Sequence, residues 1–142
     1  MKLIRFMMNN RHKKLTLKTY LLTGYYRLCI LLIPFNKLKK RLGSINEESI
    51  QNESNRNYKE ARLIQWVVEH VAHNSPWDSK CMVQAWTAQR LLRSKNISST
   101  LYLGVGKDDE GKMIAHAWIR SGQFYVTGGN GEGYAIVARF RV

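Results

Sequence analysis

The distribution of apolar and polar positions divides the chain into three parts. A mostly apolar run at residues 20–35 (YLLTGYYRLCILLIPF) predicts a helix that ends near Pro34. The polar stretch 44–57 (SINEESIQNESNRN) indicates a linker or exposed loop. We therefore divide the chain into an N-terminal helical segment (1–43), a linker (44–57) and a main domain (58–142).

The main domain changes from helical to strand-like periodicity along its length. Apolar residues recur at helical spacing over 58–74, and a second amphipathic helix is predicted to start at Cys81, with Asp78 or Ser79 as its cap. β-Branched and aromatic residues then predict strands over 97–106, 113–122, 123–129 and 134–142. The predicted fold class is α+β, with helices packed on a small antiparallel sheet and preceded by a basic, amphipathic N-terminal helical segment.

The net charge of +13 belongs almost entirely to the N-terminal segment. Residues 1–43 hold 11 Lys and Arg and no Asp or Glu, whereas residues 44–142 hold 12 basic and 10 acidic side chains. This segment could pack on the rest of the protein, contact an anionic membrane surface, or bind an acidic partner. No nucleic-acid-binding motif accompanies the charge, so we expect no nucleic-acid partner.

The apolar run does not predict a membrane span or a signal peptide. It is shorter than the roughly 20 apolar residues that a spanning helix needs, and no small-residue cleavage site follows it. Two cysteines in a chain of this length favour free thiols in a reducing compartment. We expect a cytoplasmic protein, with peripheral attachment to the inner face of the membrane as an alternative.

Cys81 and His116 are the candidate catalytic residues. A thiol at the start of a helix is favoured as a thiolate, and a histidine can take up its proton. The other cysteine, Cys29, lies in the apolar N-terminal run and is predicted to pack in the core. His70 and His73 lack further ligands at suitable spacing, so we predict no metal site and no cofactor.

The remaining candidate residues lie near Cys81 or His116 in the sequence. The tryptophans Trp77 and Trp118 are candidates for binding substrate. The glycine-rich GGNGEG at 128–133 lacks the Lys-Ser/Thr of a phosphate loop and is predicted to be a hairpin turn.

The order of a cysteine at a helix start and a later histidine on a sheet resembles papain-like and transglutaminase-like enzymes. More specifically, the chain resembles the transglutaminase-like domain of lasso-peptide biosynthesis proteins, in the split form that lacks a leader-binding module. The residues that carry this resemblance are Trp77 to Cys81, LYLGVG at 101–106, HAW at 116–118, the tail at 126–140 and, more weakly, 31–43.

The resemblance implies a cysteine peptidase that removes the leader from a lasso-peptide precursor. It implies three partners: the precursor, a separate leader-binding recognition-element protein, and an ATP-dependent cyclase that acts after cleavage. Two alternatives stay open. A transglutaminase-type acyl transferase would use the same Cys–His pair, and a basic membrane-binding or partner-binding module would use neither residue.

The chain departs from the family in the third member of its triad. The family usually has an aspartate on the strand after the histidine. A hairpin turning at Ser121-Gly122 would place His116 opposite Thr127, where no acid is present. The candidates for orienting the imidazole are the Thr127 hydroxyl, the Asn130 side chain, Glu132 and a backbone carbonyl.

Overall fold

The elements of the structure follow the order that the sequence predicts. The computed structural model describes residues 12–76 and 80–142. Its N-terminal part contains α2 (Lys13–Leu32), α3 (Phe35–Leu38), the 3-10 turn η1 (Lys39–Arg41) and strand β1 (Ser44–Ile45). The main domain contains α4 (Asn55–Asn74), α5 (Cys81–Ser94), β2 (Thr100–Lys107), β3 (Met113–Ser121), β4 (Phe124–Thr127) and β5 (Ala135–Arg141). The predicted α+β class is confirmed.

The starts of the two long helices in the main domain have different local causes. Helix α4 begins at Asn55, earlier than predicted, because Ser54 caps it and accepts a hydrogen bond from the Asn57 backbone N–H at 3.1 Å. Helix α5 begins at Cys81 as predicted, with Lys80 at the N-cap position. The predicted caps Asp78 and Ser79 lie outside the described residues.

The five strands form one antiparallel sheet in the order β1-β5-β2-β3-β4. Strand β3 pairs with β2 from Met113 to Arg120 but with β4 only from Ile119 to Ser121. The predicted pairing of His116 with Thr127 is wrong. A bulge between Ile119 and Arg120 places Thr127 opposite Ile119, so β4 ends before it reaches His116.

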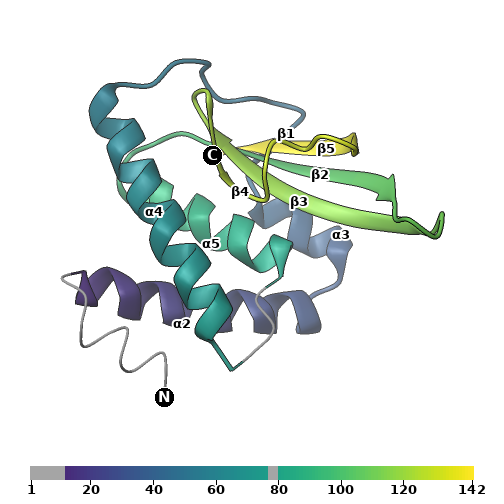
Figure 1. Cartoon of the computed structure of the whole chain (residues 1–142), viewed down its shortest axis with the longest axis horizontal. Helices are drawn as coiled ribbons and strands as arrows, with labels where there is room; N and C mark the ends of the chain where they lie inside the picture. The colour runs from purple at the N-terminus through teal and green to yellow at the C-terminus, as the bar shows by residue number, and fades with distance from the viewer. Residues whose placement is uncertain (1–11, 77–79) are drawn as a thin grey trace.

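The helices cover one face of this sheet in two layers (Figure 1). Helix α5 packs directly on β2, β3 and β4, α4 packs beside it, and α2 packs on both helices from the side away from the sheet. The core between α5 and the sheet includes Ala85 and Leu92 of the helix and Leu101, Ala117 and Ile119 of the strands. These side chains define the helix-facing side of β2 and β3.

Helix α2 is attached through an unexpected face. Its buried side carries Thr16, Thr19 and Thr23, whose hydroxyls donate to carbonyl oxygens of the preceding turn at 2.7–2.9 Å. The ring of Tyr26 stacks on Trp86 of α5 with the ring centroids 4.2 Å apart. The interpretation that this segment docks on the rest of the protein is therefore confirmed, with Leu15 and Leu22 packed partly buried against the core and the other leucines of the helix exposed.

The segment after α3 and η1 crosses the face of the sheet opposite the helices. Strand β1 extends the sheet by pairing with β5, and the Ser49 backbone N–H donates to the Thr100 hydroxyl at 2.7 Å. Arg120, only 4% exposed, donates to the carbonyl oxygens of Ser49 and Ile50 and to the Tyr102 hydroxyl. This arginine therefore ties the segment to β2 and β3.

We expect the Arg120→Ala substitution to lower the free energy of unfolding by about 3 kcal/mol, because it leaves several buried acceptors without a donor. The matched control is Arg139→Ala. Arg139 also pairs with Glu48, but it is 39% exposed and its ion pair spans 4.0 Å, so its removal should cost less than about 1 kcal/mol. Urea unfolding of both variants measures the difference, and equal losses would contradict the role given to Arg120.

Candidate active site

Cys81 is the first residue of α5 and has a free, half-buried thiol. Its side chain packs against the core beneath the sheet. The N–H groups of a first helical turn lack partners within the helix, so they can donate to a group that reacts at this position. Cys29 is 6% exposed within the core, which confirms its predicted packing role.

His116 lies half-buried in β3 and is held by a backbone carbonyl. Its Nε2 donates to the Gly128 carbonyl oxygen at 2.6 Å. Because a carbonyl oxygen can only accept, this contact places the ring proton on Nε2 and leaves Nδ1 as the basic nitrogen of the neutral imidazole. Of the groups considered for orienting His116, the backbone carbonyl is the one in contact with it.

Two neighbouring aromatic rings, Tyr134 and Trp118, pack against the imidazole, and their own centroids lie 6.2 Å apart. The centroid of the His116 ring lies 4.7 Å from that of Tyr134 and 5.8 Å from that of Trp118, and both pairs are stacked. Trp118 is only 2% exposed and stacks in turn on Tyr102. Burial and the hydrogen bond to Glu48 raise the pKa of Tyr102, which keeps its hydroxyl protonated beneath this stack.

The glycine-rich stretch 128–133 is not a hairpin turn, contrary to the prediction. It lies between β4 and β5, which are separated in the sheet by β2 and β3, so residues 128–134 cross over those two strands. The crossing passes close to Trp118. Gly131 has φ +79°, and a Cβ there would lie 2.3 Å from the indole ring. The glycines therefore let the backbone approach the rings beside His116.

Gly128 needs to be glycine for two reasons. Its φ is +78°, and a Cβ would lie 2.4 Å from the Ala117 carbonyl oxygen. Gly129 also has a positive φ, +75°, but nothing lies within 4 Å of its Cβ position. Alanine at Gly129 would therefore cost only the unfavourable backbone conformation, about 1 kcal/mol or more, whereas alanine at Gly128 would add the clash with the Ala117 carbonyl oxygen.

We expect Gly128→Ala to displace the carbonyl that holds His116 and to lower both stability and activity more than Gly129→Ala does. The expected loss of turnover is at least about tenfold for Gly128→Ala, since misorienting the base removes part of its contribution. Thermal unfolding and turnover of the two variants test this. Equal effects would mean that the carbonyl contact does not matter.

The other predicted site residues lie around this loop or outside the described residues. The Asn130 side-chain oxygen accepts from the Glu132 backbone N–H at 3.0 Å, which shapes the loop itself. Thr127 is buried beside Ile119, and its hydroxyl has no hydrogen-bond partner among the described residues. Trp77 lies outside the described residues, and because Trp118 is buried, its contact with substrate remains a prediction.

Cys81 and His116 approach from opposite faces of the sheet. Side chains alternate along a strand, and Ala117 and Ile119 belong to the core beneath α5, so His116 and Trp118 project from the other face. Within the described part of the chain, the Cys81 sulfur makes no hydrogen bond to His116. Because β4 ends at Thr127, no residue of β4 pairs with β3 at His116.

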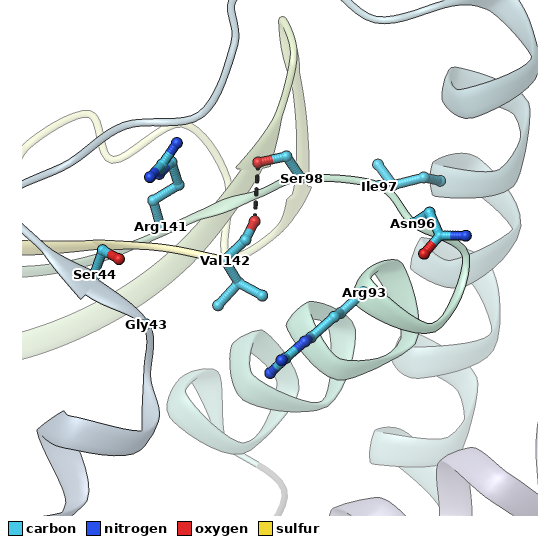
Figure 2. A pocket seen from close by; sticks show the side chains of 8 residues that line it. All are labelled: Gly43, Ser44, Arg93, Asn96, Ile97, Ser98, Arg141 and Val142. Carbon is cyan, nitrogen blue, oxygen red and sulfur yellow. Dashed lines mark hydrogen bonds between the residues drawn. The ribbon is translucent and has the colours of Figure 1, made fainter.

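A hollow of about 530 Å³ lies elsewhere, near the C-terminal ends of α5 and β5 (Figure 2). Arg93 and Arg141 border it, and the Ser98 hydroxyl donates to the Val142 carbonyl oxygen at 2.9 Å. Neither Cys81 nor His116 lines this hollow. It is therefore separate from the candidate active site.

A family model for the Transglutaminase-like superfamily matches residues 29–139, which is more than half of the chain. The chain belongs to the transglutaminase-like superfamily. The matched range of this transglutaminase-like chain contains Cys81 and His116 and also the segment that crosses the sheet between η1 and α4. Comparison with curated proteins and with solved structures gives no significant match.

Proposed function

We propose that the protein is a cysteine peptidase that removes the leader peptide from a lasso-peptide precursor, with Cys81 as nucleophile and His116 as general base and acid. The observation that carries the proposal is the superfamily match over a chain in which a half-buried thiol begins α5 and a later histidine is oriented by a backbone carbonyl. The likeness of HAW and its neighbouring segments to lasso-peptide proteins supplies the substrate class.

The proposed first step forms an acyl-enzyme. Nδ1 of His116 takes the proton of the Cys81 thiol, and the thiolate attacks the carbonyl carbon of the scissile peptide bond. As the tetrahedral intermediate collapses, the C–N bond breaks and the imidazolium returns the proton to the departing amine, which is the core peptide. The leader remains on Cys81 as a thioester, and the N–H groups of the first turn of α5 are suited to binding the developing oxyanion.

The second step releases the leader. His116 takes a proton from water, the hydroxide attacks the thioester carbonyl, and the thiolate leaves with the proton returned to sulfur. The carbonyl of Gly128 holds Nε2 throughout, so the same nitrogen, Nδ1, handles the proton in both steps. A carbonyl fixes the tautomer as a carboxylate would, but it stabilises the imidazolium less, because it carries no full charge.

This mechanism requires the imidazole and the thiol to meet around the edge of β3. At His116 this edge is not paired with β4, which pairs only with Ile119–Ser121. Catalytic hydrogen bonds are commonly long before substrate binds and tighten in the complex. We therefore propose that the bound precursor, presented by a separate leader-binding recognition protein, occupies this edge and completes the pair before an ATP-dependent cyclase uses the core peptide.

Cleavage in the presence of an added amine distinguishes this function from acyl transfer. The purified protein is incubated with precursor, recognition protein and glycine methyl ester, and the leader is weighed by mass spectrometry. We expect a leader with a free carboxylate. A leader carrying the amine in an amide bond as the main product would instead identify a transglutaminase-type acyl transferase, and an intact precursor would overturn both.

A further inference from the structure

Helix α2 exposes most of its leucines and buries its threonines, the reverse of an ordinary surface helix, and only Leu15 and Leu22 pack against the core. Thr16, Thr19 and Thr23 are fully buried, whereas the large apolar side chains on the opposite side are roughly half exposed or more. These are Leu17 (46%), Leu21 (60%), Tyr25 (53%), Leu28 (57%), Leu31 (60%) and Leu32 (76%), followed by Phe35 (52%) after the helix. We call these seven side chains the leucine face.

The leucine face is continuous along α2. Spacings of three and four residues place its members on one side of the helix. Leu17, Leu21 and Tyr25 also line one shallow surface hollow. Scattered exposed apolar residues are normal on a protein surface, but a contiguous row of this length indicates a surface that binds something.

Basic residues flank the leucine face at both ends. Lys13, Lys14 and Lys18 lie in the first two turns of α2, and Lys37, Lys39, Lys40 and Arg41 follow in α3 and η1. No acidic residue occurs in residues 1–43. None of the ion pairs between described residues involves these bases. Ion pairs between described residues therefore do not neutralise these charges, which can attract anionic groups outside the protein.

We propose that the leucine face and its flanking bases bind the surface of an anionic phospholipid membrane, with α2 lying in the plane of the interface. A single helix that presents apolar side chains between two basic clusters matches a layer whose acyl chains lie below a negative headgroup region. No helix in the described part of the chain is long and apolar enough to cross a membrane. The helix thus lies on the membrane and does not span it.

The placement of α2 in the fold agrees with such an attachment. Figure 1 shows α2 on the side of the helical layer that is remote from the sheet. His116 and the 128–134 crossing lie on the far face of that sheet. Attachment through the leucine face therefore leaves His116 and this crossing directed away from the lipid. The membrane proposal does not depend on the peptidase proposal, and neither test uses the other's readout.

Cosedimentation of the full chain with vesicles tests the proposal. The probes are vesicles of phosphatidylglycerol and phosphatidylcholine in equal parts and, separately, of phosphatidylcholine alone. We expect binding to the anionic vesicles that weakens as salt is raised, and little binding to the neutral ones. Leu21→Gln/Leu28→Gln should lower the affinity at least about tenfold, because two exposed apolar side chains no longer enter the interface.

Matched variants separate the leucine face from general effects. Ile136→Gln/Val137→Gln removes two exposed apolar side chains from β5 and should bind vesicles like the unmodified protein. Lys37→Gln/Lys40→Gln should weaken binding roughly tenfold at low salt, whereas Lys107→Gln/Lys112→Gln, on the β2–β3 hairpin, should not.

Four results would overturn the proposal. The first is no sedimentation with anionic vesicles at low salt. The second is equal binding to neutral vesicles, and the third is unchanged binding by Leu21→Gln/Leu28→Gln. The fourth is a dimer in sedimentation velocity without lipid that the same leucine variant converts to monomer, since the leucine face would then be covered by a second copy of the chain.

Discussion

Replacing Cys81 by alanine is expected to abolish precursor cleavage, with a loss of turnover of at least about 1000-fold, because no other group can form the acyl-enzyme. Cys81 is half-buried at the start of α5, and alanine fits a helix at least as well as cysteine does. The variant should therefore remain folded. Mass spectrometry of the precursor over time, with the recognition protein present, measures the loss.

Cys29→Ala is the matched control. It removes the other free thiol, which lies buried in α2 and packs within the core. We expect a modest loss of stability, about 1 kcal/mol, and unchanged turnover at a temperature where the variant is folded. Cleavage by Cys81→Ala at the rate of the unmodified protein would remove the cysteine mechanism altogether.

The sequence predicts the elements of this fold well because their signals are local. Helical spacing of apolar residues identifies α4 and α5, and β-branched and aromatic runs identify β2, β3 and β5. The early start of α4 had a signal too, since Ser54 is a typical N-cap residue. Boundaries of this kind depend on a few neighbouring residues, and a sequence contains them.

The arrangement around His116 could not be predicted in the same way. The bulge at Ile119 and the crossing of residues 128–134 both depend on which strands are neighbours in the sheet. A hairpin and a crossover can begin with the same glycine-rich stretch, because glycine serves a tight turn and a close backbone approach equally. The contact from Gly128 has no side-chain signature, since every residue carries a carbonyl.

Helix α2 shows how packing partners change the meaning of an apolar run. Its apolar run favours a buried face of leucines, yet the buried positions include three threonines that satisfy their hydroxyls within the helix, and most of the leucines are exposed. Such pairing makes burial of a hydroxyl inexpensive, so hydrophobicity alone does not choose the face. The basic residues at both ends of the helix predict its exposed side better than the leucines do, because lysine and arginine are rarely buried.

Replacing His116 by glutamine is expected to lower turnover by about 100-fold to 10,000-fold, the range attributed to general acid–base catalysis. The glutamine amide can still donate to the Gly128 carbonyl oxygen, so the loop contact that Nε2 makes is kept while the base is lost. The precursor assay measures turnover. The control His73→Gln makes the same change at an exposed position of α4 and should leave cleavage unchanged.

The double variant Cys81→Ala/His116→Gln tests whether the two residues act as one unit despite lying on opposite faces of β3. If His116 serves only to move the proton of Cys81 and of the attacking water, its loss adds nothing once the thiol is gone. The residual rate of the double variant should then equal that of Cys81→Ala alone. A further loss of 10-fold or more on the Cys81→Ala background would mean that His116 acts independently of the thiol, and a fully active His116→Gln would mean that another group is the base.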